Sequence, residues 1–289
     1  MRRLFTYLSV LLLLGALSCQ KELTLEEQYP DQNAQPDEPG EIKVMTFNIR
    51  QRNDNDGAWN YWAVRAPACR IMVEVQKPTL IGYQEFHSTQ IEYMSGTLAE
   101  KGYVTVEDEE NKNAFMYNPD ILDLETNGIF FLSETPEVSS LSWDGYVRYV
   151  TWAIMSIKAT GDRFFYINTH LGLTADSRNR AMNLIVKRLK TLNPEDLPVV
   201  FMADFNTVTE DKVFDNIRKT MVCTRDVAPI TDDVKTYNGW NSAKNTPYIC
   251  DHIWITNTIG CSEYRTVTVP YDGHTLISDH YPVYSIIKF

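Results

Sequence analysis

Short runs of apolar residues, rich in β-branched and aromatic side chains, recur along most of the chain and predict β-strands. Many of these runs are apolar at almost every position, as expected for strands that are covered on both faces. The predicted strands span residues 42–49, 79–84, 113–117, 129–132, 151–158, 164–171, 199–203, 248–255, 266–270 and 281–289.

Three segments between these runs show the spacing of three or four residues that marks an amphipathic helix. The clearest is 177–191, and 62–75 and 89–98 follow the same period. Ser88 or Thr89 is the expected N-cap of the segment 89–98. Strands outnumber helices and hairpin-like spacing follows residue 103, which disfavours a regularly alternating parallel barrel. We therefore expect an α/β fold with two packed, mainly antiparallel mixed sheets and helices outside.

The first 19 residues have a different pattern, in which a basic start is followed by a short apolar run and by small residues before Cys19. This is the pattern of a secretory signal, and the apolar run is too short to span a bilayer as a permanent helix. Cys19 stands where a bacterial lipoprotein signal places the lipidated cysteine, although a leucine lies two and not three residues before it. We expect a lipoprotein signal peptide over 1–19, with a plain cleaved signal as the alternative.

An acylated N-terminus holds a domain at a membrane surface, so we expect a lipid-anchored protein of the cell envelope, periplasmic or on the outer surface. Residues 20–40 are polar, acidic and proline-bearing and lack an apolar period, which predicts a flexible tether. Residues 41–289 suit one domain, which we expect to be monomeric.

The chain has a formal net charge of −11 and no basic run. Tight binding to nucleic acid depends on Lys and Arg side chains that displace counterions from the phosphates. A stable complex with nucleic acid is therefore not expected.

Four cysteines follow Cys19, namely Cys69, Cys223, Cys250 and Cys261. Outside the cytoplasm they would be able to form disulfides in any of three pairings, and the alternative is that they are small buried thiols. The chain has no C-x-x-C pair, which disfavours a structural zinc site.

Polar residues that are able to bind metals or take part in catalysis interrupt the predicted strands near their ends. They are Asn48, Glu85, Asn168, His170, Asp204, Asn206, Asp251, Asp279 and His280. Burying an unpaired carboxylate costs several kcal/mol, so a repeated placement of this kind requires a compensating charge. A hard cation supplies that charge, and carboxylate and amide oxygens suit magnesium, manganese or calcium better than zinc.

These positions resemble the endonuclease/exonuclease/phosphatase (DNase I-like) superfamily, and in particular its small secreted bacterial members. The resemblance runs from residue 43 to the C-terminus and rests on nine motifs in the family's order. The motifs are TFNIR (46–50), IGYQE (81–85), LSETP (132–136), RYVTWA (148–153), NTHL (168–171), ADFN (203–206), TYNGW (236–240), CDHIWI (250–255) and SDHYPV (278–283). The resemblance implies a four-layer α/β sandwich with the site at one edge of the two sheets.

The resemblance also implies a metal centre. Glu85 corresponds to the principal metal ligand, with Asn48 beside it and Asp279 completing the shell. The implied cofactor is Mg²⁺ or Mn²⁺, with Ca²⁺ as a further alternative. Such an ion polarises the scissile phosphate and offsets the charge that develops there.

The remaining roles follow from the same motifs. Asp204 resembles the residue that orients or deprotonates the attacking water, and Asn206 the one that binds a phosphate oxygen. His280, held by Asp251, resembles the histidine that contacts the phosphate or activates water. His170 is implied as the proton donor to the leaving oxygen.

Two residues are predicted to bind substrate, Arg148 through a non-bridging oxygen and Asn168 beside it. The chain departs from the family where the motif NTHL is followed by Gly172-Leu173 and not by Asp-His. This change leaves the core metal chemistry untouched.

We expect a divalent-metal-dependent phosphoric ester hydrolase that acts by in-line attack of water, without a covalent intermediate. The favoured substrates are small or lipid-linked phosphodiesters, and whether the bond is a diester or a monoester stays open. An exported nuclease is the first alternative, which the acidic net charge disfavours. The other is a catalytically idle lipoprotein that binds a carbohydrate or a protein partner.

Overall fold

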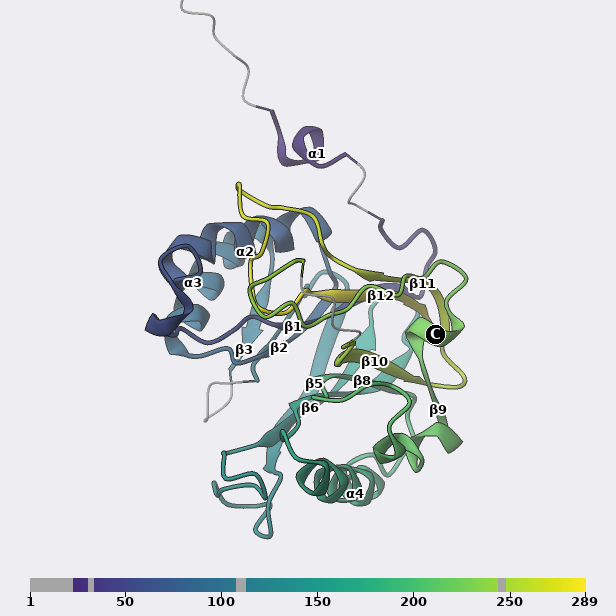
Figure 1. Ribbon diagram of the computed structural model, residues 1–289. Coiled ribbons are helices and arrows are strands. Elements are labelled where there is room, and N and C mark those ends of the chain that lie inside the picture. Colours follow the sequence, from purple (N-terminus) through teal and green to yellow (C-terminus); the bar gives the residue numbers. More distant parts are fainter. Residues whose placement is uncertain (1–22, 31–33, 108–112, 244–247) are drawn as a thin grey trace, which may run out of the picture.

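The structure is a computed structural model that describes residues 23–30, 34–107, 113–243 and 248–289 (Figure 1). The predicted signal peptide and Cys19 lie outside these residues. Within the described ranges, no helix has the length and apolar character needed to cross a membrane.

Two six-stranded sheets form the centre of the fold, as predicted (Figure 1). The first sheet has the order β11-β12-β1-β2-β4-β3 and the second β5-β6-β7-β8-β10-β9. In chain order the strands are β1 (Glu41–Asn48), β2 (Leu80–Gln84), β3 (Val104–Val106), β4 (Phe115–Tyr117), β5 (Leu122–Phe131), β6 (Tyr149–Ile157), β7 (Arg163–His170), β8 (Val199–Asp204), β9 (Met221–Cys223), β10 (Asp251–Thr256), β11 (Gly260–Thr266) and β12 (Val283–Lys288). Only the pairs β1–β2 and β7–β8 are parallel.

Helices cover the outer face of each sheet, which gives four layers. Figure 1 shows α2 and α3 against the first sheet and α4 below the second. The helices are α1 (Leu25–Gln28), α2 (Trp62–Gln76), α3 (Ser88–Leu98), α4 (Ala175–Leu192) and α5 (Thr224–Val227), with short 3-10 turns at Asp54–Asp56, Ala99–Lys101, Lys212–Phe214 and Ile217–Lys219. The three long helices agree with the predicted segments, but the N-cap of α3 is His87, not Ser88 or Thr89.

Three apolar clusters hold the layers together. One lies between the first sheet and the helices α2 and α3, one between the two sheets, and one between the second sheet and α4. The middle cluster includes Val44 and Leu80 from the first sheet and Met202 and Ile253 from the second, all of them fully buried. Both sheets are therefore covered on two faces, which explains the almost continuous apolar runs in the sequence.

The strand prediction fails at three places. The strands β3 and β9 were not predicted, and each has only three residues. The run 266–270 is not a strand, and the actual strand β11 precedes it. Because β11 is at the edge of its sheet and alternates buried and exposed positions, its sequence GCSEYRT has no apolar run.

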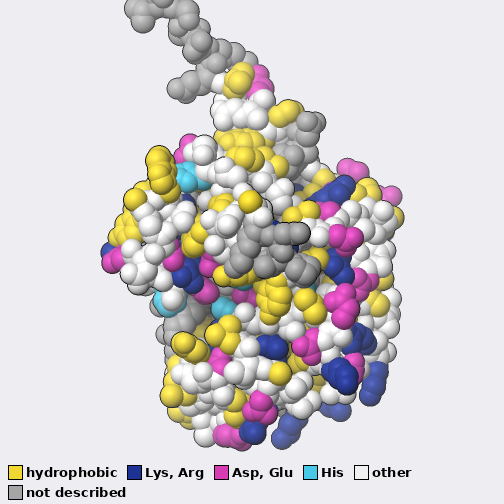
Figure 2. Space-filling model, viewed as in Figure 1, with side chains coloured by type: hydrophobic (Ala, Val, Ile, Leu, Met, Phe, Trp, Pro, Cys, Tyr) yellow, Lys and Arg dark blue, Asp and Glu magenta, His cyan; other side chains and the backbone are white. Residues whose placement is uncertain are grey.

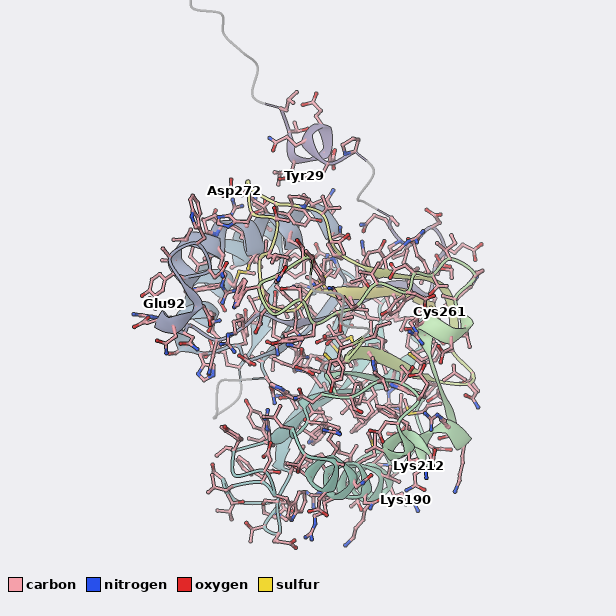
Figure 3. The ribbon with its side chains drawn as sticks, in the orientation of Figure 1. Tyr29, Glu92, Lys190, Lys212, Cys261 and Asp272 are labelled. Carbon is pink, nitrogen blue, oxygen red and sulfur yellow. The ribbon has the colours of Figure 1, made fainter. Side chains whose placement is uncertain are left out.

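Part of the predicted tether contacts the domain. The ring of Tyr29 lies 5.0 Å from that of Tyr271, and its hydroxyl accepts a hydrogen bond from the backbone N–H of Asp272 (Figure 3). Lys43 Nζ donates to the carbonyl oxygen of Ala34 at 3.0 Å. The lack of an apolar period predicted little packing for residues 20–40, but a few side chains suffice to hold the described part against the first sheet and α2.

The topology explains why polar residues from distant parts of the chain meet. The carboxyl ends of β1 and β2 lie at one edge because these strands are parallel, and the same holds for β7 and β8. The strands β12 and β10 run antiparallel to β1 and β8, so their beginnings lie at that edge too. Residues that end β1, β2, β7 and β8 and residues that begin β10 and β12 therefore converge.

Candidate active site

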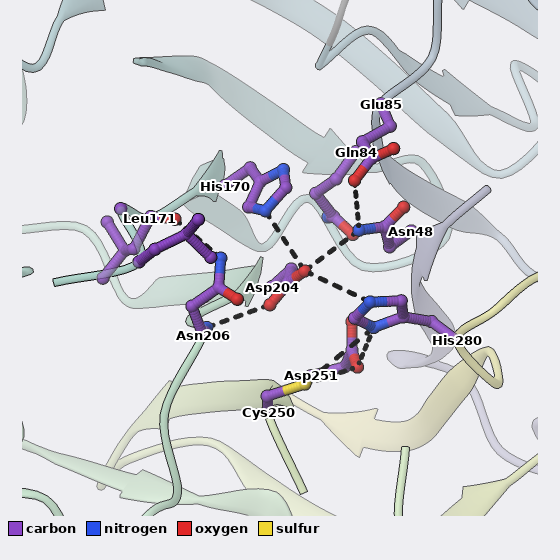
Figure 4. A network of polar contacts seen from close by, with 12 residues as sticks. Asn48, Gln84, Glu85, His170, Leu171, Asp204, Asn206, Cys250, Asp251 and His280 are labelled. Atoms are coloured by element: carbon purple, nitrogen blue, oxygen red, sulfur yellow. Dashed lines mark hydrogen bonds and ion pairs between the residues drawn. The ribbon is translucent and has the colours of Figure 1, made fainter. Parts of the chain in front are cut away.

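A cavity of about 630 Å³ opens at this edge. Its walls include seven of the predicted site residues, namely Glu85, Arg148, His170, Asp204, Asn206, Asp279 and His280. Figure 4 shows most of these side chains pointing toward one another from different strands. The convergence predicted from the motifs is present in the structure.

Asp204 lies at the centre of the polar network (Figure 4). It is buried, and its Oδ2 atom accepts a hydrogen bond from Asn48 Nδ2 at 3.0 Å. The same oxygen lies 3.3 Å from His170 Nε2 and 3.7 Å from His280 Nε2. Burial alone raises the pKa of this carboxyl group, but the two imidazoles outweigh burial and hold the pKa below its usual value. Asp204 is therefore an ionised carboxylate at neutral pH.

His280 is held by a second carboxylate. Its Nδ1 atom lies 2.9 Å from Asp251 Oδ2, and both residues are buried. Burial disfavours the charged imidazole, but Asp251 and Asp204 outweigh it and raise the pKa of His280 well above its ordinary value. His280 is therefore an imidazolium that faces the cavity.

His170 differs from His280 in its charge. Burial is the dominant influence and lowers the pKa of His170 despite the nearby Asp204 carboxylate. The imidazole is therefore mainly neutral at neutral pH. This differs from the predicted role as a proton donor, which requires a protonated imidazole.

Two further carboxylates converge at the other side of the cavity. Arg50 Nη1 lies 3.7 Å from Glu85 Oε2 and 3.7 Å from Asp279 Oδ2, so one cationic nitrogen faces both groups. Arg50 itself is fixed by two hydrogen bonds of 2.9 Å to Asp56. Burial and the nearby Glu85 raise the pKa of Asp279, whereas neighbouring donors and charges lower that of Glu85. A cation between the two carboxylates would relieve their repulsion.

This pair of carboxylates fits the hard divalent cation that the motifs imply. Carboxylate oxygens are the preferred ligands of Mg²⁺, Mn²⁺ and Ca²⁺. Glu85 and Asp279 would hold the ion. A different group of ligand atoms also lies close together, on Asp204, Cys250, Asp251 and His280, all within 4.8 Å of one another.

Asn48 is placed differently from its predicted role as a metal ligand. Its Oδ1 atom accepts the backbone N–H of Arg50, which fixes the orientation of the amide. Its Nδ2 atom then points to Glu85 at 3.3 Å and to Asp204 at 3.0 Å. Asn48 is therefore a donor that orients both carboxylates, while its oxygen keeps one further lone pair.

Asn206 is at the cavity wall, as predicted. Its backbone N–H donates to Asp204 Oδ1 at 2.9 Å, and its amide donates to the carbonyl oxygen of Leu171. The hydroxyl of Tyr248 donates to the carbonyl oxygen of Asn206 at 2.6 Å. These contacts make Asn206 a support for Asp204 as well as a wall residue.

Three residues of the site have a left-handed backbone conformation, with φ of 58° at Arg50, 56° at Glu85 and 52° at Asn206. A positive φ is uncommon for residues other than glycine and costs free energy. Such strain is typical of functional sites, where surrounding contacts hold it in place. Here the hydrogen bond from Gln51 N–H to Glu85 Oε2, at 3.0 Å, is one of these contacts.

Arg148 lines the cavity, and Asp144 holds it there. Asp144 Oδ2 lies 3.2 Å from Arg148 Nη2 and accepts the backbone N–H of Leu173 at 3.2 Å. A Cβ atom at Gly172 would lie 2.8 Å from the same carboxylate oxygen and 2.1 Å from Ser177 Oγ. The Gly172-Leu173 sequence, the departure from the family motif, thus makes room for the Asp144–Arg148 pair.

Replacing Arg148 by Ala is expected to raise the KM for a phosphate ester about tenfold, because one charge-assisted hydrogen bond to the phosphate is lost. The measurement is steady-state kinetics, with Arg163→Ala as the control. Arg163 forms ion pairs with Glu125 and Glu195 on the surface, so its loss should leave KM unchanged. An unchanged KM in the Arg148 variant would remove this residue from the binding site.

Asn168 is not at the cavity, which corrects its predicted role in substrate binding. It is fully buried, and its Nδ2 atom donates to the carbonyl oxygens of Tyr83 and Asn113 at 2.8 and 3.0 Å. Its Oδ1 atom accepts from Gln84 Nε2 at 2.7 Å. A Cβ atom at Gly82 would lie 3.0 Å from this amide, so the glycine permits the close approach. Asn168 therefore joins β7 of the second sheet to β2 of the first.

Replacing Asn168 by Ala is expected to lower the free energy of unfolding by about 2–5 kcal/mol, because three buried polar partners lose their hydrogen bonds. Denaturant unfolding measures this change, and Asn183→Ala on the exposed face of α4 is the matched control. If both variants unfold like the parent chain, the proposed link between the sheets carries no stability.

Sequence reasoning did not single out Arg50, Asp144 or Cys250 as site residues. Arg50 and Cys250 lie inside quoted motifs, so their proximity to Glu85 and Asp251 in the sequence was the available signal. Asp144 lies four residues before Arg148 in an irregular loop, where spacing carries no structural meaning. All four cysteines after Cys19 are free thiols, and Cys69, Cys223 and Cys250 are buried as the alternative to disulfides predicts, whereas Cys261 is partly exposed.

The comparisons with known proteins agree with this geometry. No protein-family model matches the chain. A solved endonuclease/exonuclease/phosphatase family protein from Bacteroides thetaiotaomicron superposes with a TM-score of 0.79 and 26% identity, over 88% of this chain and 99% of that one. A mannosyl-6-phosphatase of Bacteroides thetaiotaomicron gives 0.78 and 26%, over 86% and 100%. An uncharacterized protein of Acanthamoeba polyphaga mimivirus is 23% identical, over 86% of this chain and 100% of its own length.

The two solved relatives match nearly their whole length, so the likeness covers the entire domain and not a shared fragment. The motif residues also meet at the sheet edge where the resemblance placed them. The chain therefore has the fold of the endonuclease/exonuclease/phosphatase superfamily, and its likeness to these members supports a phosphoric ester hydrolase.

Proposed function

We propose that this hydrolase requires a divalent cation and cleaves small or lipid-linked phosphodiesters by in-line attack of water, without a covalent intermediate. The observation that carries the proposal is the convergence of the ionised Asp204, the imidazolium His280 and the facing pair Glu85 and Asp279 on one cavity. Such a site offers a position for water, a positive contact for a phosphate oxygen and a place for a cation.

A divalent cation at Glu85 and Asp279, in this proposal Mg²⁺ or Mn²⁺, would offset the charge that develops on the phosphate during attack. Asp204 would accept a hydrogen bond from the attacking water and aim its oxygen at phosphorus. Asn48 and the backbone N–H of Asn206 keep that carboxylate in one orientation.

The histidines would act at the phosphate. His280, kept charged by Asp251, would donate from Nε2 to a non-bridging oxygen. His170 would hold the water or a phosphate oxygen by a hydrogen bond as a neutral imidazole. Arg148 would contact a second non-bridging oxygen from the cavity mouth.

The charge of the cavity favours a diester over a monoester. Arg50 and Arg148 are each already paired with a carboxylate, Asp56 and Asp144. The remaining groups are the four carboxylates Glu85, Asp204, Asp251 and Asp279 and the imidazolium of His280. Ionised together they leave three negative charges, which a divalent cation reduces to one. A phosphodiester with one negative charge is repelled less by this site than a monoester with two.

The rim of the cavity supports a substrate with an organic group on each side of the phosphate. Tyr146 and Leu173 are 58% and 60% exposed there, and Tyr248 is 37% exposed. Apolar side chains at a polar site provide contacts for a base, a sugar face or a lipid chain.

The described part of the face in Figure 2 gives no support to a stable complex with nucleic acid. On the described part of the face in Figure 2, Lys and Arg side chains alternate with Asp and Glu and form no broad basic area. Together with the net charge of −11, this arrangement disfavours binding along a phosphate backbone.

A sugar phosphate monoester is the second candidate, and the mannosyl-6-phosphatase from Bacteroides thetaiotaomicron at 26% identity is the observation that favours it. The two candidates share the same cation and water chemistry. They differ in whether the substrate brings one or two negative charges into the cavity.

The test compares a chromogenic phosphodiester, the matching monoester, mannose 6-phosphate and plasmid DNA, each with Mg²⁺, with Mn²⁺ and with excess chelator. We expect the highest kcat/KM on the diester and loss of more than about 100-fold of that rate with chelator. Preference for either monoester would replace the first proposal by the second, and preference for DNA would support the nuclease. Undiminished hydrolysis in chelator would exclude the cation. Absence of turnover on all four, with metal bound, would support the catalytically idle lipoprotein.

We also propose that the chain is lipid-anchored in the cell envelope through Cys19, as its N-terminal pattern suggests. Cys19→Ser should release the protein from membranes into the soluble fraction and remove the lipid mass from its N-terminal peptide. Membrane association that survives this substitution would contradict the anchor.

A further inference from the structure

A thiol lies directly behind the catalytic histidine. Cys250 Sγ is 3.4 Å from Asp251 Oδ2 and 3.9 Å from His280 Nδ1 (Figure 4). Asp251 Oδ2 and His280 Nδ1 are themselves 2.9 Å apart. The roles proposed for Asp251 and His280 do not use this thiol, although Cys250 lines the cavity.

The spacing of these atoms matches the ligand shell of a zinc ion. Zinc binds sulfur at about 2.3 Å and nitrogen or oxygen at about 2.0–2.2 Å in a tetrahedron, which separates neighbouring ligand atoms by about 3.3–3.7 Å. Two of the three observed separations differ from this range by about 0.2 Å or less. The hydrogen bond between Asp251 and His280 would open by about 0.4 Å. Asp204 supplies a fourth ligand atom, and all four ligand atoms lie within 4.8 Å of one another.

A second feature points to a ligand at the same place. Asp251 is fully buried, and its Oδ1 atom has no hydrogen-bond partner among the described residues. An ionised carboxylate oxygen that is buried without a partner is costly, and a bound cation satisfies it. The atom that contacts Cys250 and His280 is the other oxygen, Oδ2, so a cation at this place would satisfy Oδ1 by binding both oxygens of the carboxylate.

We propose that Cys250, Asp251 and His280, with Asp204 as a fourth ligand, form a site for Zn²⁺, and that zinc bound there inhibits the hydrolase. Binding would release two protons, one from Cys250 Sγ and one from His280 Nδ1, and no electron is transferred. The ion would replace the hydrogen bond between Asp251 and His280, so that His280 no longer offers its charge to the phosphate. The binding is independent of the proposed function, whereas the inhibition rests on it.

This site is distinct in chemistry from the position between Glu85 and Asp279. That position offers two carboxylates, which suit Mg²⁺, whereas sulfur and imidazole ligands favour zinc. Excess Mg²⁺ should therefore not displace zinc from Cys250. Zinc that stays bound in excess Mg²⁺ is therefore assigned to the Cys250 site and not to the position between Glu85 and Asp279.

Zinc binding is measured without substrate by competition with a chromogenic zinc chelator, on the full chain saturated with Mg²⁺. Cys250→Ser is the test variant and Cys261→Ser the control, because Cys261 is a half-buried thiol on β11 away from the site (Figure 3). We expect zinc affinity to fall at least about tenfold in the first variant and to stay unchanged in the second. Equal zinc affinity of the parent chain and the Cys250 variant would overturn the proposal.

A second measurement does not depend on folding of the variant. Cobalt(II) in place of zinc should give the parent chain a near-ultraviolet charge-transfer band, which arises only when a thiolate binds the metal. Absence of that band, with cobalt bound, would exclude Cys250 as a ligand. The band should persist in Glu85→Gln, which alters the other cation position.

Zinc inhibition is then measured as the rate of each variant relative to its own zinc-free rate. The concentration for half inhibition should rise at least about tenfold in Cys250→Ser and not in Cys261→Ser. If the chain binds zinc through Cys250 but hydrolyses no ester, the proposed function fails and the zinc site stands. If the chain hydrolyses esters but binds zinc equally well without the Cys250 thiol, the zinc site fails and the proposed function stands.

Discussion

Replacing Asp204 by Asn is expected to lower kcat by about 10²–10⁴-fold while the protein stays folded. The carboxylate is the central acceptor of the site, with Asn48, His170 and His280 all directed at its Oδ2 atom. An amide at this position keeps the shape but has no negative charge to orient the water. It also brings a second NH₂ group against donors that now face a carboxylate.

Stability should fall as well. The pKa of Asp204 is lowered in the folded chain, so its charged form stabilises the fold, and its neutralisation should lower the free energy of unfolding. Steady-state kinetics and thermal unfolding on the same preparation check both effects. Asp215→Asn on the exposed surface, where Asp215 pairs with Arg218, is the control and should change neither. Normal turnover by the Asp204 variant would remove this residue from the reaction.

Replacing Asp251 by Asn is expected to lower kcat by about 10²–10⁴-fold as well, because the imidazole of His280 loses the carboxylate that orients and charges it. The hydrogen bond of 2.9 Å between the two side chains is the contact at stake. Asp226→Asn, a half-exposed carboxylate beside Arg225, provides a control with the same chemical change.

The pH profile separates this role from a structural one. The pKa of His280 is raised by Asp251, so the imidazolium is present below that raised pKa and is lost as the pH rises through it. Without Asp251 the pKa falls, and the alkaline limb of kcat should move to lower pH. If the Asp251→Asn variant loses activity but the alkaline limb of its kcat profile stays at the same pH, Asp251 acts on folding and not on the charge of His280.

The main elements of the fold follow from local patterns. Long apolar runs predict the central strands because both sheets are covered on two faces, and the period of 177–191 predicts α4 because one side of that helix packs on the second sheet. The strands β3, β9 and β11 escape this reasoning. Two of them are too short to show a period, and β11 alternates at an open edge. β9 pairs with β10 and β11 with β12, and a longer stretch of chain separates the members of each pair.

In the site, too, some features follow from the sequence pattern and others depend on tertiary contacts. Polar residues at strand ends predict which side chains meet, since topology brings those ends to one edge. Their individual roles depend on hydrogen bonds that the sequence does not reveal. Asn48 and Asn168 are both amides at strand ends, but one faces two carboxylates and the other is enclosed between the sheets. The charges of His170 and His280 likewise depend on burial and on which carboxylate lies nearest.

The order in which the chain builds the two sheets has a consequence for biosynthesis. Strands β1–β4 belong to the first sheet, β5–β10 to the second, and β11 and β12 return to the first. Asp279 and His280 lie shortly before β12, the last strand of the first sheet. A nascent or truncated chain that stops before Asp279 has most of both sheets but lacks the His280 imidazole. Hydrolytic activity should therefore appear only after Asp279 and His280 have been added and β12 has joined the first sheet.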